Sequence, residues 1–130
     1  MIYTGTKIKV NNLNLGSFYI YFGGRIMEKL FFTITGIKYC FGNGFMEPGM
    51  EVKLVKEPDN EDDKEAIKVE LEGLGLIGYV ANSPHTVLGE SMSAGRLYDK
   101  IGEETVGIVK YKLPGGVLCE IKMQDSNVEE

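Results

Sequence analysis

Short runs of alternating apolar and polar residues, many of them closed by glycine or by a Pro-Gly pair, cover most of this chain. Alternation with a period of two is typical of a β-strand with one buried face, and glycine supplies the backbone conformations that tight turns need. The apolar runs are much too short to span a bilayer, which takes about 20 residues. The pattern therefore predicts a mainly β domain without a membrane-spanning segment.

Six strands follow from this pattern: Leu30–Ile37, Glu51–Lys56, Ala66–Leu71, Leu76–Val80, Thr105–Leu113 and Val117–Met123. Helical signals are fewer. Asn82-Ser83-Pro84 joins a capping side chain to a proline suited to a first helical turn, and it predicts a short helix through Leu88. Ala94–Ile101 predicts a second helical turn. Six short strands with one or two short helices in 130 residues predict one domain, built as a small barrel or sandwich.

The first 27 residues differ from the rest in charge, because they contain no Asp or Glu and carry Lys7, Lys9 and Arg25. Gly23-Gly24-Arg25 stands just before Met27, and a purine-rich ribosome-binding site translated in frame would read in this way. We therefore hypothesise a leader over residues 1–27, a natural start at Met27, a domain over residues 28–124 and an acidic tail over residues 125–130. The alternative is a genuine edge strand at Phe18–Phe22.

The sequence holds two cysteines, Cys40 and Cys119, and one histidine, His85. A structural zinc site takes about four such ligands, so none is expected here. Asparagine and glycine interrupt the apolar residues near the N-terminus, so we expect neither a secretory signal peptide nor a disulfide between the two cysteines. We therefore expect a cytoplasmic protein, with two reduced thiols and a histidine that faces solvent.

The segment Gly73-Leu74-Gly75-Leu76-Ile77-Gly78 matches a dinucleotide-binding fingerprint letter for letter. That fingerprint has to open a helix, whose N-terminus then binds the pyrophosphate. Here the residues that follow are expected to form a strand. We therefore assign these glycines to a hairpin turn and expect no cofactor.

The densest charge lies in Lys56–Glu65, where two lysines face six acids. Its acids partly match a calcium-binding loop, but Lys64 stands where that loop needs glycine, and Glu70 falls in an expected strand. Carboxylates can also serve as acid–base catalysts, yet no nucleophile or histidine stands nearby in the sequence. We expect neither a metal site nor an enzyme. A solvated turn is the simplest explanation, in which Asn60 and Asp63 fix the loop through bonds to its own backbone.

A formal net charge of −5 excludes a strongly basic DNA coat protein, so a nucleic-acid site would have to be a local patch. The acidic loop itself repels a phosphate backbone. Its carboxylates are better suited to accept a hydrogen bond from a hydroxyl or from a base amino group.

The order of residues around this loop resembles the HIRAN domain. Val52-Lys53-Leu54-Val55-Lys56 is followed by Glu57-Pro58-Asp59-Asn60, by Asp63, by Ala66-Ile67-Lys68-Val69 and by Ile77-Gly78-Tyr79-Val80. The family signature has the same order: a strand, an acid-Pro-x-Asn-x-x-Asp-x-x-Ala-Ile-x-Val run, and a strand with Gly-Tyr or Gly-His. The similarity covers about residues 30–122 and implies an OB-like β-barrel of six strands.

The resemblance also implies a function. In this family the domain is attached to helicase-like ATPases or to nucleases, or it stands alone in bacteria and phages. Its studied eukaryotic members bind single-stranded DNA and hold a free 3′ end. The chain has no room for an ATPase, so it would be a stand-alone bacterial or phage member. We expect it to act in DNA repair or at replication forks, with a helicase or nuclease as its partner.

Part of the family's DNA pocket is implied residue by residue. Tyr39 resembles the aromatic residue that stacks on a base, and Lys38 stands where a basic residue contacts the backbone. Asn60 and Asp63 match the positions that shape the pocket, with Asp63 as the acceptor for a 3′-hydroxyl. Tyr79 would be either core or pocket wall.

Two positions depart from the family pattern. Asp62 replaces a tyrosine, which removes a stacking platform worth about 1–3 kcal/mol per base. Asn82 replaces a lysine that binds phosphate. Phe41 or Phe45 would have to supply the missing ring. A second function therefore stays open, namely a protein-interaction or adaptor domain that has lost its affinity for DNA.

Overall fold

The computed structural model describes residues 6–12, 17–22, 25–37 and 44–122, and it describes side chains from residue 28 onward within these ranges. The described elements are the strands β1 (Thr6–Asn12), β2 (Ser17–Phe22), β3 (Arg25–Thr35), β4 (Glu51–Lys56), β5 (Ile67–Leu71), β6 (Gly75–Val80), β7 (Glu104–Leu113) and β8 (Gly116–Ile121), and the helix α1 (Ala94–Tyr98). No helix among these residues is long and apolar enough to cross a membrane.

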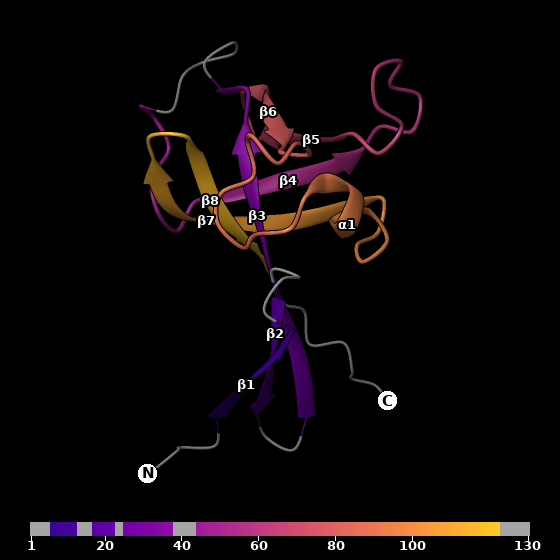
Figure 1. The fold of residues 1–130 in the computed structure, drawn as a ribbon. Helices are drawn as coiled ribbons and strands as arrows, with labels where there is room; N and C mark the ends of the chain where they lie inside the picture. The colour runs from indigo at the N-terminus through magenta and orange to yellow at the C-terminus, as the bar shows by residue number, and fades with distance from the viewer. Residues whose placement is uncertain (1–5, 13–16, 23–24, 38–43, 123–130) are drawn as a thin grey trace.

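Six of the strands close into an antiparallel barrel (Figure 1). Its order is β3-β6-β5-β4-β7-β8, and a second pairing between β8 and β3 completes the ring. The closure leaves the barrel with few free backbone groups at sheet edges. The predicted six-stranded barrel is thus confirmed, and the alternative of a sandwich is wrong.

The core lies inside the barrel and is built by the alternation seen in the sequence. In β4 the polar Glu51 and Lys53 are exposed, whereas Val52 and Leu54 between them are buried. Inward residues from all six strands meet in this core: Phe32, Ile34, Val52, Leu54, Ile67, Val69, Ile77, Val109, Val117 and Cys119. Each large apolar side chain buried in this way stabilises the fold by about 1.5–3 kcal/mol.

A glycine makes room for the largest of these side chains. A Cβ atom added to Gly107 of β7 would lie 2.7 Å from Cζ of Phe32, which is closer than real Cβ contacts. Gly78 of β6 is required in the same way, since its Cβ atom would lie 2.7 Å from the carbonyl oxygen of Thr35. These two glycines let β7 and β6 pass close to β3.

The strands β1 and β2 extend the sheet away from the barrel (Figure 1). β2 pairs with the first half of β3, from Arg25 to Leu30, before β3 enters the barrel at Phe31. The alternative of an edge strand at Phe18–Phe22 corresponds to β2, but β2 lies between β1 and β3 rather than at an edge. A natural start at Met27 and the domain limits drawn from it stay predictions.

Five of the six predicted strands begin or end at other residues than expected, and only Glu51–Lys56 has the predicted bounds. β3 begins at Arg25 because it pairs with β2, and it ends at Thr35 because Gly36 adopts a positive φ of 77°. Two glycines of the fingerprint, Gly73 and Gly75, lie at the β5–β6 hairpin turn with positive φ, as expected, whereas the third, Gly78, lies within β6. The predicted end at Met123 and the acidic tail lie outside the described residues.

The helix predicted from Asn82 to Leu88 is wrong. The amides of Thr86 and Val87 donate to the carbonyl of Ser83, at 2.9 and 3.0 Å, and so make a single turn. The next amide, that of Leu88, donates to Oγ1 of the buried Thr33 at 3.1 Å, which ends the turn. The second predicted helix exists as α1, but it is shorter than expected and stops at Tyr98.

Candidate nucleic-acid interface

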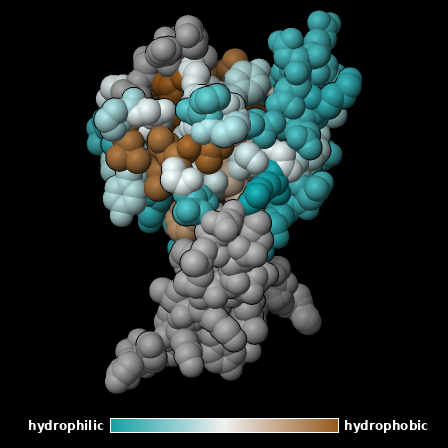
Figure 2. All heavy atoms as spheres, in the orientation of Figure 1, coloured by the Kyte–Doolittle hydropathy of each residue, from teal (hydrophilic) through white to brown (hydrophobic). Residues whose placement is uncertain are grey.

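The loop between β4 and β5 is closed at its base and protrudes from the barrel. The amide of Glu57 donates to the carbonyl of Ala66 at 2.8 Å, and the amide of Ala66 donates to the carbonyl of Asp63 at 3.1 Å. In Figures 1 and 2 this loop is the hydrophilic arm at the upper right. It is therefore a structured turn, in which four of the six acids are exposed and Glu57 and Asp63 are half-buried.

Asn60 organises the first half of this loop. Its Oδ1 atom accepts bonds from the amides of Asp62 and Asp63, at 2.9 and 3.0 Å, and its Nδ2 atom donates to Oε1 of Glu57 at 3.0 Å. An Asx side chain that bonds backbone two and three residues on is the expected way to fix such a turn. The sequence expectation for Asn60 as a shape-fixing residue agrees with this geometry.

Asp63 connects the loop to the rest of the fold. Its Oδ1 atom accepts from the amide of Glu65 and its Oδ2 atom accepts from Nδ2 of Asn82, both at 2.9 Å. Oδ1 of Asn82 in turn accepts from the amide of Gly95, in the first turn of α1, at 2.8 Å. An ionised carboxylate can accept about four hydrogen bonds, so the half-buried Asp63 keeps capacity for a further donor.

Gly95 lets the helix approach this loop. A Cβ atom at Gly95 would lie 2.7 Å from Oε1 of Glu65 and 3.4 Å from Oδ1 of Asn82. The Asn82 side chain therefore lies in a narrow space between the loop and α1. A longer side chain at this position would have to displace one of the two.

Glu57 joins the loop to the outer face of the barrel. Its Oε1 atom accepts the hydroxyl proton of Tyr79 at 3.1 Å, besides the bond from Asn60. Its Oε2 atom lies 3.9 Å from Nζ of Lys68, and Tyr79 stands beside Lys68 in the pairing of β5 and β6. Tyr79 thus lies on the outside of the barrel, as a wall beside the loop rather than as core.

The structure brings together three of the six predicted site residues. Asn60, Asp63 and Tyr79 are linked through Glu57 and through the Asp63 amide. Sequence reasoning assigned no role to Glu57, although it is the acid of the family signature. Glu57 stands three residues before Asn60, and this spacing could have indicated the bond between the two side chains.

The other three predicted site residues, Lys38, Tyr39 and Phe41, lie outside the described residues. Thr35, which precedes them in the sequence, pairs with Tyr79. Phe45, the alternative to Phe41 as a replacement ring, is half-buried and packs against the core, which does not favour a stacking role.

Lysines near the loop are partly engaged with other side chains. Nζ of Lys56 lies 4.5 Å from the centre of the Tyr98 ring, a cation–π distance. Lys68 pairs with Glu57 and with Glu70, the latter at 3.2 Å. Within the described ranges, no three His, Cys, Asp or Glu side chains are placed to hold a metal ion.

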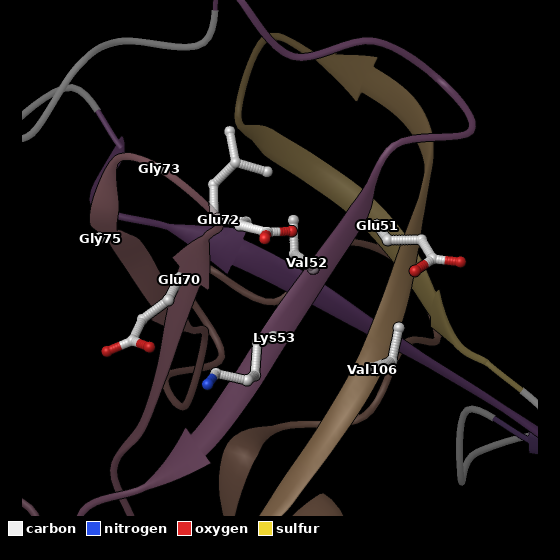
Figure 3. A pocket seen from close by; sticks show the side chains of 9 residues that line it. Glu51, Val52, Lys53, Glu70, Glu72, Gly73, Gly75 and Val106 are labelled. Atoms are coloured by element: carbon white, nitrogen blue, oxygen red, sulfur yellow. The ribbon is translucent and has the colours of Figure 1, made fainter.

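A second surface feature is a groove at the other end of the β4–β5 hairpin (Figure 3). Acidic side chains border it, and one lysine stands between them on β4; it is lined by Glu51, Val52, Lys53, Glu70, Leu71, Glu72, Gly73, Gly75 and Val106. Leu74 and Leu76, next to this groove in the sequence, are 45% and 38% exposed. Leu76 pairs with Glu70 of the lining, so exposed apolar surface adjoins the acidic groove.

Comparison with known proteins agrees with the sequence and the fold. A family model described as the HIRAN domain matches residues 27–110. The chain is also similar to the crystal structure of the HIRAN domain of human HLTF, at 21% sequence identity and a TM-score of 0.51, over 72% of each chain. No match was found among curated proteins. At this identity the structural likeness supports the fold, and it confirms the expected OB-like barrel.

Proposed function

This chain belongs to the HIRAN domain family, a family of DNA-binding modules, and from that premise we propose that it binds single-stranded DNA and recognises a free 3′ end. The proposed activity is binding without catalysis. It would serve DNA repair or replication-fork processing, with a helicase or nuclease as the partner that acts on the bound strand.

The arrangement of Asp63 is the observation that supports end recognition. Two of its acceptor positions are filled by Glu65 and Asn82, which fix the direction of the carboxylate. A terminal 3′-hydroxyl can donate to the remaining acceptor capacity, whereas a 3′-phosphate would bring negative charge to a negative loop. The site should therefore prefer a hydroxyl end.

The charge of the loop also limits how a strand can enter. Lys56–Glu65 carries six acids against two lysines, and Asp62 and Asn82 supply neither a ring nor a positive charge. Affinity for the strand must then come from other positions. Tyr39 as a stacking residue and Lys38 as a phosphate contact remain our proposal for this role.

The test is a titration of labelled single strands that differ only in a 3′-hydroxyl or a 3′-phosphate, across a salt series. Hydrogen bonds to charged groups contribute about 1.5–3 kcal/mol, so we expect roughly a tenfold to 150-fold preference for the hydroxyl. Asp63→Ala should abolish it. Asp59→Ala removes the same charge from an exposed position in the same loop and should keep it. No binding by the wild type at low salt would refute the proposal.

A protein-interaction domain is the second candidate, and the groove in Figure 3 favours it. Glu72 makes no hydrogen bond or ion pair with any described residue, and Leu74 and Leu76 are exposed nearby. This chemistry suits a partner segment with basic and aliphatic side chains. A lysine- and leucine-bearing peptide that binds the wild type but not Glu72→Lys, together with no DNA binding at low salt, would establish this function instead.

A further inference from the structure

The hairpin of β7 and β8 extends beyond the barrel and leaves an aromatic side chain in solvent. Tyr111 is 60% exposed, Leu113 is 38% exposed, and Lys112 between them is also exposed. Successive strand residues point to opposite faces, so three exposed residues in a row mean that described residues cover neither face. In Figure 1 this hairpin lies at the left of the barrel, away from the acidic loop.

A β-bulge sets the direction of these side chains. Val109 pairs with Cys119 and Tyr111 pairs with Leu118, so Lys110 is an extra residue on β7. A bulge bends the strand and re-aims the residues that follow it. It is the bulge that separates the buried part of β7, which ends at Val109, from its exposed end.

The stretch of sequence around Tyr111 is positively charged, in a protein of formal net charge −5. No acid occurs between Glu104 and Glu120 in the sequence, whereas Lys110 and Lys112 flank the tyrosine. Lys112 makes no ion pair or hydrogen bond with any described residue. Both oxygens of the Glu120 carboxylate already face lysines.

The contacts of Glu120 with two lysines leave Lys110 in a cluster with surplus positive charge. Oε1 of Glu120 lies 3.8 Å from Nζ of Lys110, and Oε2 lies 2.7 Å from Nζ of Lys29. Lys29 and Lys110 therefore share one carboxylate, and Lys112 adds a third positive charge that no described acid pairs. Such a patch attracts a polyanion by releasing its counterions.

An aromatic ring between two lysines is the combination that binds single-stranded nucleic acid without regard to sequence. Bases stack on the ring and the lysines contact neighbouring phosphates. We propose that Tyr111 is a second base-stacking site, with Lys110 and Lys112 as its phosphate contacts, on the same single strand whose 3′ end the loop would hold. The evidence for a stacking site at Tyr111 comes from the β7–β8 hairpin alone. The further claim, that the loop holds the 3′ end of the same DNA strand, rests on the proposed function.

A continuous stretch of chain joins the two places. Asn82 is bonded to Asp63 at the loop, and Leu88 lies beside the hairpin tip, where a Cβ atom at Gly115 would be 3.3 Å from its Cδ2 atom. In Figure 1 the chain between these residues crosses the front of the barrel. A strand that follows this path would reach Tyr111 several nucleotides from its end.

The test compares a circular single strand, which has no end, with a linear strand of the same length and a free 3′-hydroxyl. Loss of one stacked base lowers affinity by about fivefold to 150-fold, so Tyr111→Ala should weaken binding of the circle by this factor. Tyr111→Phe keeps the ring and should bind like the wild type. Leu74→Ala, a change at another exposed apolar residue, is the control for general surface effects.

Two further readouts separate a direct contact from a structural effect. Lys112→Ala should reduce the slope of log K against log salt by about 0.7, the value for one phosphate on a single strand. A strand with 5-iodouracil should photo-crosslink to Tyr111.

The outcomes distinguish this inference from the proposed function. If Tyr111→Ala leaves the circle unaffected while 3′-hydroxyl preference persists, the second site is refuted and end recognition stands. If the circle binds through Tyr111 but the hydroxyl preference is absent, the second site stands and end recognition fails. If the wild type binds neither strand, both are refuted.

Discussion

Nδ2 of Asn82 donates to Oδ2 of Asp63 at 2.9 Å, and this bond connects the acidic loop to the chain that follows β6. The same amide group reaches the backbone of Gly95 through its oxygen. The resemblance to the family implies a phosphate-binding lysine at this position. Here a neutral side chain has become a bridge between loop and helix, so its effect on binding should be indirect.

Asn82→Ala should therefore loosen the loop and reduce the preference for a 3′-hydroxyl, because Asp63 loses one of the two bonds that orient it. The lost bonds should also lower the free energy of unfolding by about 0.5–1.5 kcal/mol each. Urea unfolding and titrations with the two end chemistries measure these effects. Ser83→Ala is the matched control, since it removes one local bond, to the amide of His85 at 3.1 Å, and touches neither loop nor helix. Equal end preference in both variants would contradict a positioning role for Asn82.

Asp62→Tyr should strengthen binding of single-stranded DNA. Asp62 is exposed at a position where the resemblance implies an aromatic ring, and only its amide is bonded within the loop, to Asn60. A new stacking platform should raise the affinity by about fivefold to 150-fold, measured by fluorescence anisotropy. Asp62→Ala removes the same charge without adding a ring. If both variants gain equally, repulsion by the carboxylate and not the missing ring limits affinity.

Gly107→Ala should destabilise the barrel. Its new Cβ atom would lie 2.7 Å from the Phe32 ring and 3.1 Å from Cδ1 of Leu54, and overpacking of this kind costs about 1–3 kcal/mol. Urea unfolding measures the loss. Gly102→Ala is the control, because its Cβ atom would meet nothing nearer than 4.0 Å. A neutral Gly107→Ala would mean that Phe32 can shift within the core.

The barrel could be predicted from the sequence because the alternation of each strand and the glycines of each turn lie within short segments of the chain. Glu51–Lys56 was predicted with the bounds that β4 has. The helix at Asn82 was mispredicted because its outcome depends on a distant residue, Thr33, which accepts the bond that would have continued the helix. The residues around Asn82 do not indicate that Thr33, 55 positions before Leu88, will accept this bond.

The candidate site was predictable only in part, for a similar reason. Asn60 acts on its own loop, and Asx preferences reveal that much. The role of Glu57 depends on Tyr79, which is 22 positions away in the sequence and comes close only when the strands pair. The exposed end of β7 went unnoticed as a surface because alternation suggests burial for Tyr111 or its neighbours, whereas the bulge at Lys110 resets the pattern.

Cys119 should be unreactive in the folded protein, and its burial should make stability depend on alkaline pH. Desolvation raises the pKa of its thiol from 9.0 to about 12, so the folded state keeps the proton that the unfolded state loses above about pH 9. Because the unfolded state then binds fewer protons, the free energy of unfolding falls as pH rises from 9 towards 12. In a Cys40→Ser background, where Cys119 is the remaining cysteine, thiol labelling at pH 8 should require unfolding. The same protein should lose stability between pH 9 and 11 more steeply than its Cys119→Ala derivative. Parallel pH profiles, or rapid labelling without denaturant, would show that this thiol is reached by water in the native barrel.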